Sequence, residues 1–346
     1  MRRLPHAVAL SFVATLSLLA GCGGPQGPVD GARAYAHLER LVGFGPRPFG
    51  SDALGKTADY ITGELTGLGL QPRRQEVMHA TEKKLIRNLW VQIDGEDPAK
   101  GPVLVIGAHY DTKLAEGHGD AAHNFPFKGA IDGGGGPAVL LELARVLTLP
   151  EHKPKVNVWL YWIDAEESID WQWNDNRALL GSKEFCKWLS ESKQLARVKA
   201  FVLLDLIGSK NWKIDRDGNS DGKLQDIFER AGKAMGAEDR IYEFPRPDEL
   251  AYYEQRGVPW GITDDHKTFS GYGVPSVLLI DFSRRIPPHL QGLKPGDQPQ
   301  VDPRYEQWWH TPDDDLAATD RDALAFAGNL VLQALPALET FVRDRK

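Results

Sequence analysis

The sequence predicts an α/β fold in which helices flank a largely parallel central sheet. Short apolar runs rich in β-branched and aromatic residues alternate with segments whose apolar residues recur at helical spacing. The middle runs are almost continuously apolar, as strands are when both faces of a parallel sheet are buried. This alternation is typical of a wound α/β sheet. The chain of 346 residues would fit one large domain or two small ones, and we expect one.

The expected elements follow one another along the chain. Two surface helices come first, the second ending at a Gly-Leu-Gly sequence. Strands are then interleaved with further helices, and the chain ends in a helix. The expected helices cover residues 31–44, 50–70, 137–147, 179–192, 224–236 and 321–343, and the expected strands cover residues 85–93, 102–111, 156–167, 200–208 and 275–282.

The N-terminus differs from the rest of the chain. Two arginines precede an apolar stretch, residues 7–20, that is short for a membrane span and typical of a signal peptide. The sequence LAGC at residues 19–22 resembles a bacterial lipobox, which implies cleavage before Cys22 and a lipid on its sulfur; simple secretion is the alternative. We therefore expect a lipoprotein signal peptide at 1–21, a flexible Gly- and Pro-rich tether at 22–30 and one domain at 31–346.

The charge of the chain indicates which partners it can bind, and its two cysteines have separate expected roles. The net charge of −7 and the lack of a basic tract argue against a nucleic-acid partner. We expect a monomer in the cell envelope, attached to the membrane only through the lipid on Cys22. Cys186, the other cysteine, lies in a helical pattern and is expected to be a buried apolar residue.

Acids and histidines follow the apolar runs, where the loops of an α/β sheet form ligand sites. Each has an ordinary alternative role: an aspartate can cap a helix, a glutamate can be solvated in a loop, and a histidine beside tryptophans can be packed. Their joint occurrence favours a site, and carboxylates with imidazoles suit zinc, which is catalytic when one coordination position stays open. The candidate residues are His109, Asp132, Glu166, Glu167, Asp205 and His310.

The ordered sequences GAHYDTK, GAIDGGGG, DAEES, LLDLIGS, DDH and WWHT resemble the clan that joins zinc-dependent aminopeptidases with glutaminyl-peptide cyclotransferases. The resemblance covers nearly all of the expected mature chain and implies a single α/β domain around a mixed, mostly parallel sheet. It also implies that Asp132, Glu167 and His310 are zinc ligands, and that Glu166 carries a proton during the reaction.

The two branches of the clan differ in their metal content. His109 and Asp205 match the further ligands of a two-metal aminopeptidase site, in which Asp132 would bridge both ions. The sequence DLIGS at 205–209, the first acid of DDH (Asp264) and the aromatic residue before the last ligand resemble the cyclases instead. In the cyclases the acid at the place of Asp264 pairs with the acid at the place of Asp205, and such a pair is a poor ligand for a second cation.

We therefore expect a glutaminyl-peptide cyclotransferase with one zinc ion, which converts the N-terminal glutamine of peptides or proteins to pyroglutamate and releases ammonia. Asp205 and Asp264 would belong to its catalytic acid network. A zinc aminopeptidase with two ions is the main alternative, and a non-catalytic binding module is a third. Leu278 stands where the cyclases carry a histidine, which is a departure from their pattern.

Tryptophans are candidates for the wall of a small substrate pocket. Trp173 falls where the cyclases carry a pocket tryptophan, and Trp308 and Trp309 precede the last expected ligand. Filling the core or covering a sheet edge is the alternative role for each of them.

One loop resembles half of a calcium site. Asp217, Asn219, Asp221 and Gly222 have the spacing of the first positions of a calcium loop. The twelfth position is Phe228 instead of glutamate, so we expect a turn-rich surface loop in preference to a calcium site.

Overall fold

The computed structural model describes residues 27–117, 123–210, 213–242, 251, 254, 261–281 and 308–345. The expected signal peptide, Cys22 and the first part of the expected tether lie outside the described residues.

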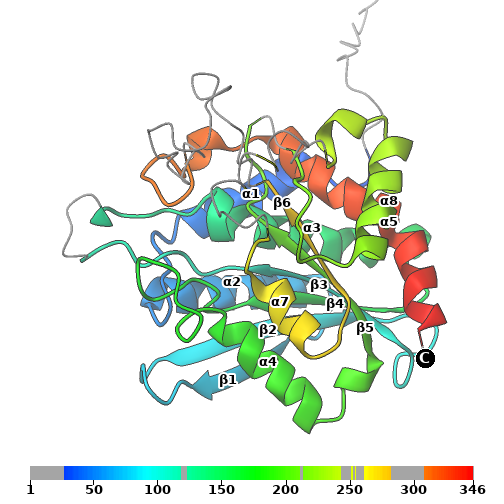
Figure 1. Cartoon of the computed structure of the whole chain (residues 1–346), viewed down its shortest axis with the longest axis horizontal. Coiled ribbons are helices and arrows are strands. Elements are labelled where there is room, and N and C mark those ends of the chain that lie inside the picture. The colour runs from blue at the N-terminus through cyan, green and yellow to red at the C-terminus, as the bar shows by residue number, and fades with distance from the viewer. Residues whose placement is uncertain are drawn as a thin grey trace, which may run out of the picture.

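The core of the fold is a sheet in the order β1-β2-β4-β3-β5-β6, seen obliquely in the centre of Figure 1. β1 and β2 pair antiparallel, as do β2 and β4, while the other neighbouring strands are parallel. The sheet is therefore mixed and mostly parallel, and the predicted fold class is confirmed. The strands are β1 (Arg73–Met78), β2 (Leu85–Ile93), β3 (Val103–His109), β4 (Asn157–Ile163), β5 (Val198–Asp205) and β6 (Ser276–Ile280).

Helices cover both faces of the sheet (Figure 1). One face carries α1 (Gly31–Val42), α2 (Asp52–Gly67), α3 (Gly136–Leu147), α5 (Gly222–Ala234) and α8 (Arg321–Asp344), whose apolar residues form the larger core cluster. The other face carries α4 (Leu180–Glu191) and α7 (Asp265–Gly271) over a second, aromatic-rich cluster. Although α8 is long and apolar enough to cross a membrane, it packs against α1, α3 and α5 as a core helix does.

The end of the expected tether is packed against the domain. Val29 is buried, and its N–H donates to Oδ1 of Asn329 in α8 (3.1 Å). The N–H of Asp30 donates to Glu142 Oε1 in α3 (3.0 Å), while the Asp30 carboxylate caps α1 by accepting from the N–H of Ala32. Val29 and Asp30, the two residues before α1, are thus held against α8 and α3.

The predicted helices and the five predicted strands are present, with ends shifted by a few residues. β1 and α7 were not predicted, because both lack the pattern that identifies such elements. β1 is a polar edge strand of sequence RRQEVM with mostly exposed side chains. α7 is a single short helix of seven residues.

The loop that resembles a calcium site has other contacts. Oδ1 of Asp217 accepts from the N–H of Ile262 (2.8 Å), Asn219 donates to the carbonyl of Ile262, and Asp221 caps α5. These contacts favour the expected turn-rich loop over a calcium site, since the side chains point to different partners. The loop is also less superficial than expected, because Asp217 is buried. Cys186 is buried as predicted, and burial raises the pKa of its thiol.

Candidate metal centre

The candidate residues converge at the carboxyl ends of the central strands of the sheet. β4, β3 and β5 are neighbours and parallel, so their carboxyl ends meet there. β3 ends at His109, β5 ends at Asp205, and the chain leaving β4 carries Glu166 and Glu167. Asp132 and His310 reach the same place from the loop before α3 and from the segment before α8. The side chains lie where ligands bind in open α/β sheets.

Asp132, Glu167 and His310 form the first of two ligand clusters, with one ligand atom of each within 4.8 Å of the others. Nε2 of His310 lies 3.3 Å from Oδ2 of Asp132 and 3.3 Å from Oε1 of Glu167. Two atoms bound about 2.0–2.1 Å from one tetrahedral zinc ion stand about 3.3 Å apart. Oδ2 of Asp132 is buried and has no well-formed hydrogen bond to any described residue. The cluster thus has the atoms, the spacing and an unsatisfied oxygen for a metal ion.

His109, Asp132 and Asp205 form the second cluster. Nε2 of His109 lies 3.2 Å from Oδ1 of Asp132 and 2.9 Å from Oδ1 of Asp205, the latter a hydrogen-bond distance. Burial acts to lower the pKa of His109, but hydrogen bonds to Asp111, Asp132 and Asp205 outweigh it and raise the pKa well above its usual value. In this geometry His109 is a charged donor to the acids around it.

Asp132 belongs to both clusters, with one oxygen directed at each histidine. Burial acts to raise the pKa of this carboxyl, but the close contacts with His109 and His310 outweigh it and lower the pKa. Burial acts to lower the pKa of His310, which Glu167 and Asp132 raise to about 9. Asp132 is thus the anion that balances both imidazoles.

The adjacent acids after β4 serve one centre because the chain turns there. Ala165 has a φ of 54°, in the left-handed region, so the residues that follow no longer alternate as in a strand. The carboxylate of Asp111 then accepts from the N–H of Glu166 (3.1 Å) and from the N–H of Glu167 (3.2 Å). Asp111 also lies 3.5 Å from Nδ1 of His109. This buried acid was not assigned a role from the sequence.

Glu166 and Asp264 are buried acids whose pKa values are raised. Burial, and then the charge of Asp264, raises the pKa of Glu166 well above its usual value. Burial, and then the charge of Asp205, likewise raises the pKa of Asp264. These carboxyls therefore interact through their charges, while Asp264 Oδ2 has no hydrogen-bond partner among the described residues.

Lys113 was also missed by the sequence analysis. Its buried ammonium donates to the carbonyls of Ser168 (2.7 Å) and Asp170 (2.9 Å) and lies 3.7 Å from Oε2 of Glu167. It fixes the start of the loop that follows the two glutamates. No spacing rule marks such a residue, because it acts on backbone carbonyls distant in sequence.

The aromatic surroundings of the centre differ from the prediction at one position. The ring of Trp309 stacks on His310 with a centroid distance of 4.2 Å, and Trp308 is half-buried in the neighbouring core. Trp173 is 43% exposed and donates its indole N–H to Asp175 at the surface. Trp171 contacts His310 instead, with ring centroids 5.9 Å apart. The two tryptophans are two residues apart, and counting from a distant sequence feature selected the outer one.

Leu278, which stands in place of a cyclase histidine, lies in β6 and is buried in the aromatic-rich core cluster. Its side chain can form no hydrogen bond, so the acids receive none from this position. The acid network here must depend on the remaining residues.

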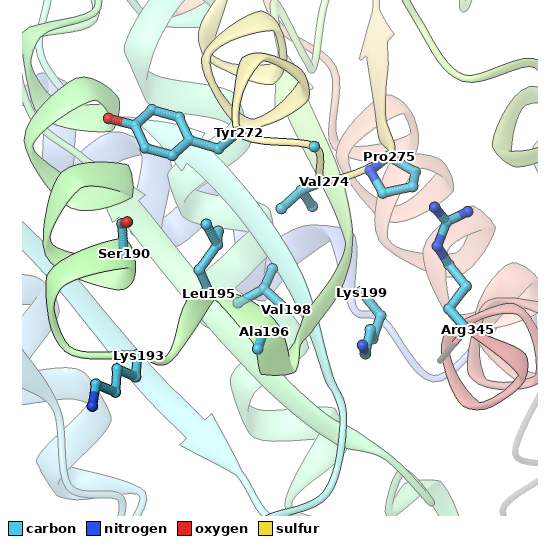
Figure 2. Close-up of a pocket in the computed structure, with 11 residues that line it drawn as sticks. Ser190, Lys193, Leu195, Ala196, Val198, Lys199, Tyr272, Val274, Pro275 and Arg345 are labelled. Atoms are coloured by element: carbon cyan, nitrogen blue, oxygen red, sulfur yellow. The ribbon is translucent and has the colours of Figure 1, made fainter.

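A hollow of about 460 Å³ lies away from the centre (Figure 2). It is lined by Val198 at the start of β5, by Pro275 just before β6, and by Tyr272 and Arg345 among others. The ligand clusters lie at the carboxyl ends of these parallel strands. The hollow is therefore at the opposite ends of the strands, where they begin. It contains none of the candidate residues.

Comparison with known proteins agrees with this geometry. Glutaminyl-peptide cyclotransferase of Dictyostelium discoideum is 27% identical over 237 residues, which are 64% of this chain and 56% of that protein. Aminopeptidase YwaD of Bacillus subtilis is 27% identical over 236 residues, 67% of this chain and 40% of that protein. The chain thus spans about half the length of these curated relatives.

Among solved structures, glutaminyl cyclase of an Acidobacteriales bacterium superposes with a TM-score of 0.72 at 24% identity, covering 94% of this chain and 99% of that chain. This likeness shows the fold. The sequence profile described as peptidase family M28 matches residues 88–335, which include five of the six sheet strands and every candidate ligand. The resemblance predicted from the sequence is confirmed, and the chain belongs to peptidase family M28.

Proposed function

We propose that the protein is a glutaminyl-peptide cyclotransferase that uses one zinc ion held by Asp132, Glu167 and His310. The observation that carries the proposal is the difference between the two clusters. In the first, His310 Nε2 lies 3.3 Å from an oxygen of Asp132 and of Glu167, at zinc spacing. In the second, His109 Nε2 lies 3.2 Å from Asp132 but only 2.9 Å from Asp205, which favours a hydrogen bond between His109 and Asp205. Similarity to named cyclotransferases supports the same activity.

The substrate would be the N-terminal glutamine of a peptide or protein. A zinc ion at the first cluster would polarise the γ-carbonyl of that glutamine. The α-amine nitrogen attacks the carbonyl carbon, a new C–N bond closes the ring, and the bond to the amide nitrogen breaks to release ammonia. Glu166 takes a proton from the attacking amine and returns it to the departing nitrogen. Its raised pKa suits a group that must both accept and donate a proton.

The acid network keeps the second cluster closed to metal. Asp205 accepts a hydrogen bond from His109, and its negative charge raises the pKa of its neighbour Asp264. The carboxylate of Asp205 therefore already has interaction partners within the protein. A carboxylate with such partners is a weak ligand for a further cation. Asp111, which lies 3.5 Å from His109 Nδ1 and accepts from the N–H of Glu166, then orients the proton carrier, and no water nucleophile is required.

A two-zinc aminopeptidase is the second candidate, because Asp132 directs one oxygen to each cluster as a bridging ligand would. Similarity to a named aminopeptidase supports it. The purified domain should be incubated with Gln-peptides and with Leu-peptides, and ammonia and free amino acid should be followed. We expect ammonia from Gln-peptides only; release of leucine without ammonia would establish the peptidase instead.

We also propose that the protein is a lipoprotein of the cell envelope, anchored through Cys22. The supporting features are the arginines, the apolar stretch and the LAGC sequence of the N-terminus. Growth of expressing cells with labelled palmitate should label the wild-type chain and not Cys22→Ala. Equal labelling of both chains would contradict the proposal.

A further inference from the structure

We propose that Arg47 and Asp314 are positioning residues that hold the Asp132 loop, residues 129–133, by its carbonyl and N–H groups respectively and so keep the metal site in binding geometry. Neither residue reaches the ligand clusters directly. Both are fully buried, and each interacts with backbone groups of this loop. The inference rests on the metal site of the proposed function but does not require the cyclase reaction.

Asp314 binds the N–H groups of the loop. Its Oδ1 lies 2.7 Å from the N of Ile131 and its Oδ2 lies 3.1 Å from the N of Asp132. Its own carbonyl accepts from the N–H of Ala130 at 3.5 Å. One acid thus satisfies consecutive donors, including the backbone donor of the residue that both clusters share.

Arg47 binds the carbonyl groups of the same loop. Its guanidinium donates to Gly129 O (2.8 Å), to Gly133 O (3.3 Å) and to Lys128 O (3.0 Å), just before the loop. A guanidinium has five N–H donors in a fixed plane, so it can hold several carbonyls at once. The cation therefore binds carbonyl groups of the loop, and the anion binds N–H groups of neighbouring peptides.

The loop itself has little conformational preference. It lies in the sequence GAIDGGGG, and Gly129 and Gly133 have φ values of 53° and 83°. Glycine loses more backbone freedom on ordering than other residues, so this loop is costly to hold in one shape. A Cβ at Gly133 would lie 2.0 Å from the carbonyl oxygen of Asp111, so the glycine cannot be replaced to stiffen the chain. Contacts with residues outside the loop are therefore needed to hold its backbone in one conformation.

The same two residues join the loop to the segments that carry the histidines. Arg47 also donates to the carbonyl of Tyr110, the residue after His109 (3.3 Å). Asp314 follows His310 in one tight segment, where its N–H donates to Thr311 O (3.2 Å). Three ligand-bearing segments are thereby fixed relative to one another without any metal ion.

The test is metal affinity, measured by chelator competition with zinc on Arg47→Lys and Asp314→Asn. Lysine keeps the charge but not the planar set of donors, and asparagine loses one of two acceptor oxygens. We expect the zinc dissociation constant of each to rise by about 10- to 100-fold, as for other groups that support metal ligands. Affinity within about twofold of wild type in a folded variant would overturn the proposal.

Matched controls come from the far side of the fold. Arg197 also holds backbone carbonyls, those of Gly101 and Pro98, and Asp221 also accepts from consecutive N–H groups as the cap of α5. Arg197→Lys and Asp221→Ala, which removes the cap of α5, should lower the unfolding temperature without changing zinc affinity. An equal affinity loss in the controls would show a general effect of destabilisation and would also overturn the proposal.

Amide hydrogen exchange of the wild-type chain gives a result even if both variants fail to fold. In zinc-free protein the amides of Ile131 and Asp132 should exchange slowly, because Asp314 already holds them. Rapid exchange that slows only after zinc is added would mean that metal, and not these residues, orders the loop. Failure of the wild type to bind zinc would instead refute the proposed function.

Discussion

His109 donates from Nε2 to Oδ1 of Asp205 across 2.9 Å, a separation shorter than that of two ligands on one tetrahedral zinc ion. From this contact we predict one zinc ion per chain. His109→Gln should keep that ion, because His109 is not one of its three proposed ligands, whereas Glu167→Ala should lose it. Elemental analysis after dialysis measures both variants. Two ions in the wild type, falling to one in His109→Gln, would contradict the prediction.

Glu166→Gln should separate proton transfer from metal binding. The substitution preserves shape but removes the titrating oxygen, so zinc content should stay at the wild-type level while turnover falls by about 10²- to 10⁴-fold. Steady-state ammonia release and metal analysis on the same preparation provide the check. Activity close to that of wild type would remove Glu166 from the proposed role.

Trp171 and Trp173 form a matched pair for the substrate pocket. Trp171 contacts His310, whereas Trp173 is exposed and bound to Asp175. Loss of one aromatic contact with the substrate should raise KM by about 10-fold in Trp171→Ala, since such contacts contribute about 0.5–1.5 kcal/mol beyond area burial. Trp173→Ala should leave KM within twofold. The reverse order of effects would restore Trp173 as the pocket residue.

Stability should depend on pH through Asp164. Burial, and then the charge of Asp111, raises the pKa of this carboxyl to about 8, and its Oδ1 has no hydrogen-bond partner among the described residues. The folded state therefore holds a proton that the unfolded state releases near pH 4. The stability due to this proton is complete below about pH 4 and is lost as the pH rises towards 8, by at most about 1.4 kcal/mol per pH unit.

Asp164→Asn cannot lose a proton and can still accept from the N–H of Arg87, which now donates to Asp164 Oδ2 at 2.6 Å. Urea unfolding of zinc-free protein should show that the free energy of unfolding of the variant increases relative to that of wild type as the pH rises from 5 to 8. Asp226→Asn, at an exposed position of α5, is the control and should track wild type. If the free energies of unfolding of Asp164→Asn and wild type differed by a constant amount across this pH range, the raised pKa of Asp164 would be disproved.

The sequence allowed prediction of the fold wherever burial leaves a periodic pattern. Strands such as β3 and β4 are apolar along their whole length because the sheet buries both their faces. β1 is an edge strand with polar side chains, so composition alone could not distinguish it from a loop. The candidate ligands could be picked out for a related reason, since His109 and Asp205 end buried strands and Glu167 follows another within a few residues.

The groups that support the ligands could not be predicted. Asp111, Lys113 and Asp314 act on backbone atoms of distant segments, and such contacts leave no periodicity. Backbone geometry was equally hidden, because His310 has a φ of 52°, a left-handed conformation that is uncommon outside glycine and costs about 1–3 kcal/mol. A strained residue of this kind persists only when its surroundings hold it, and those surroundings exist only in the folded chain.

The burial of Val29 between helices limits how far the enzyme can stand from a surface. If Cys22 carries the proposed lipid, the chain between them can extend over roughly 25 Å, at ~3.6 Å per residue. The catalytic domain would then work within a thin layer above the bilayer. Short peptides could diffuse into that layer from any side, whereas bulky folded proteins would have to present an N-terminus in the remaining gap.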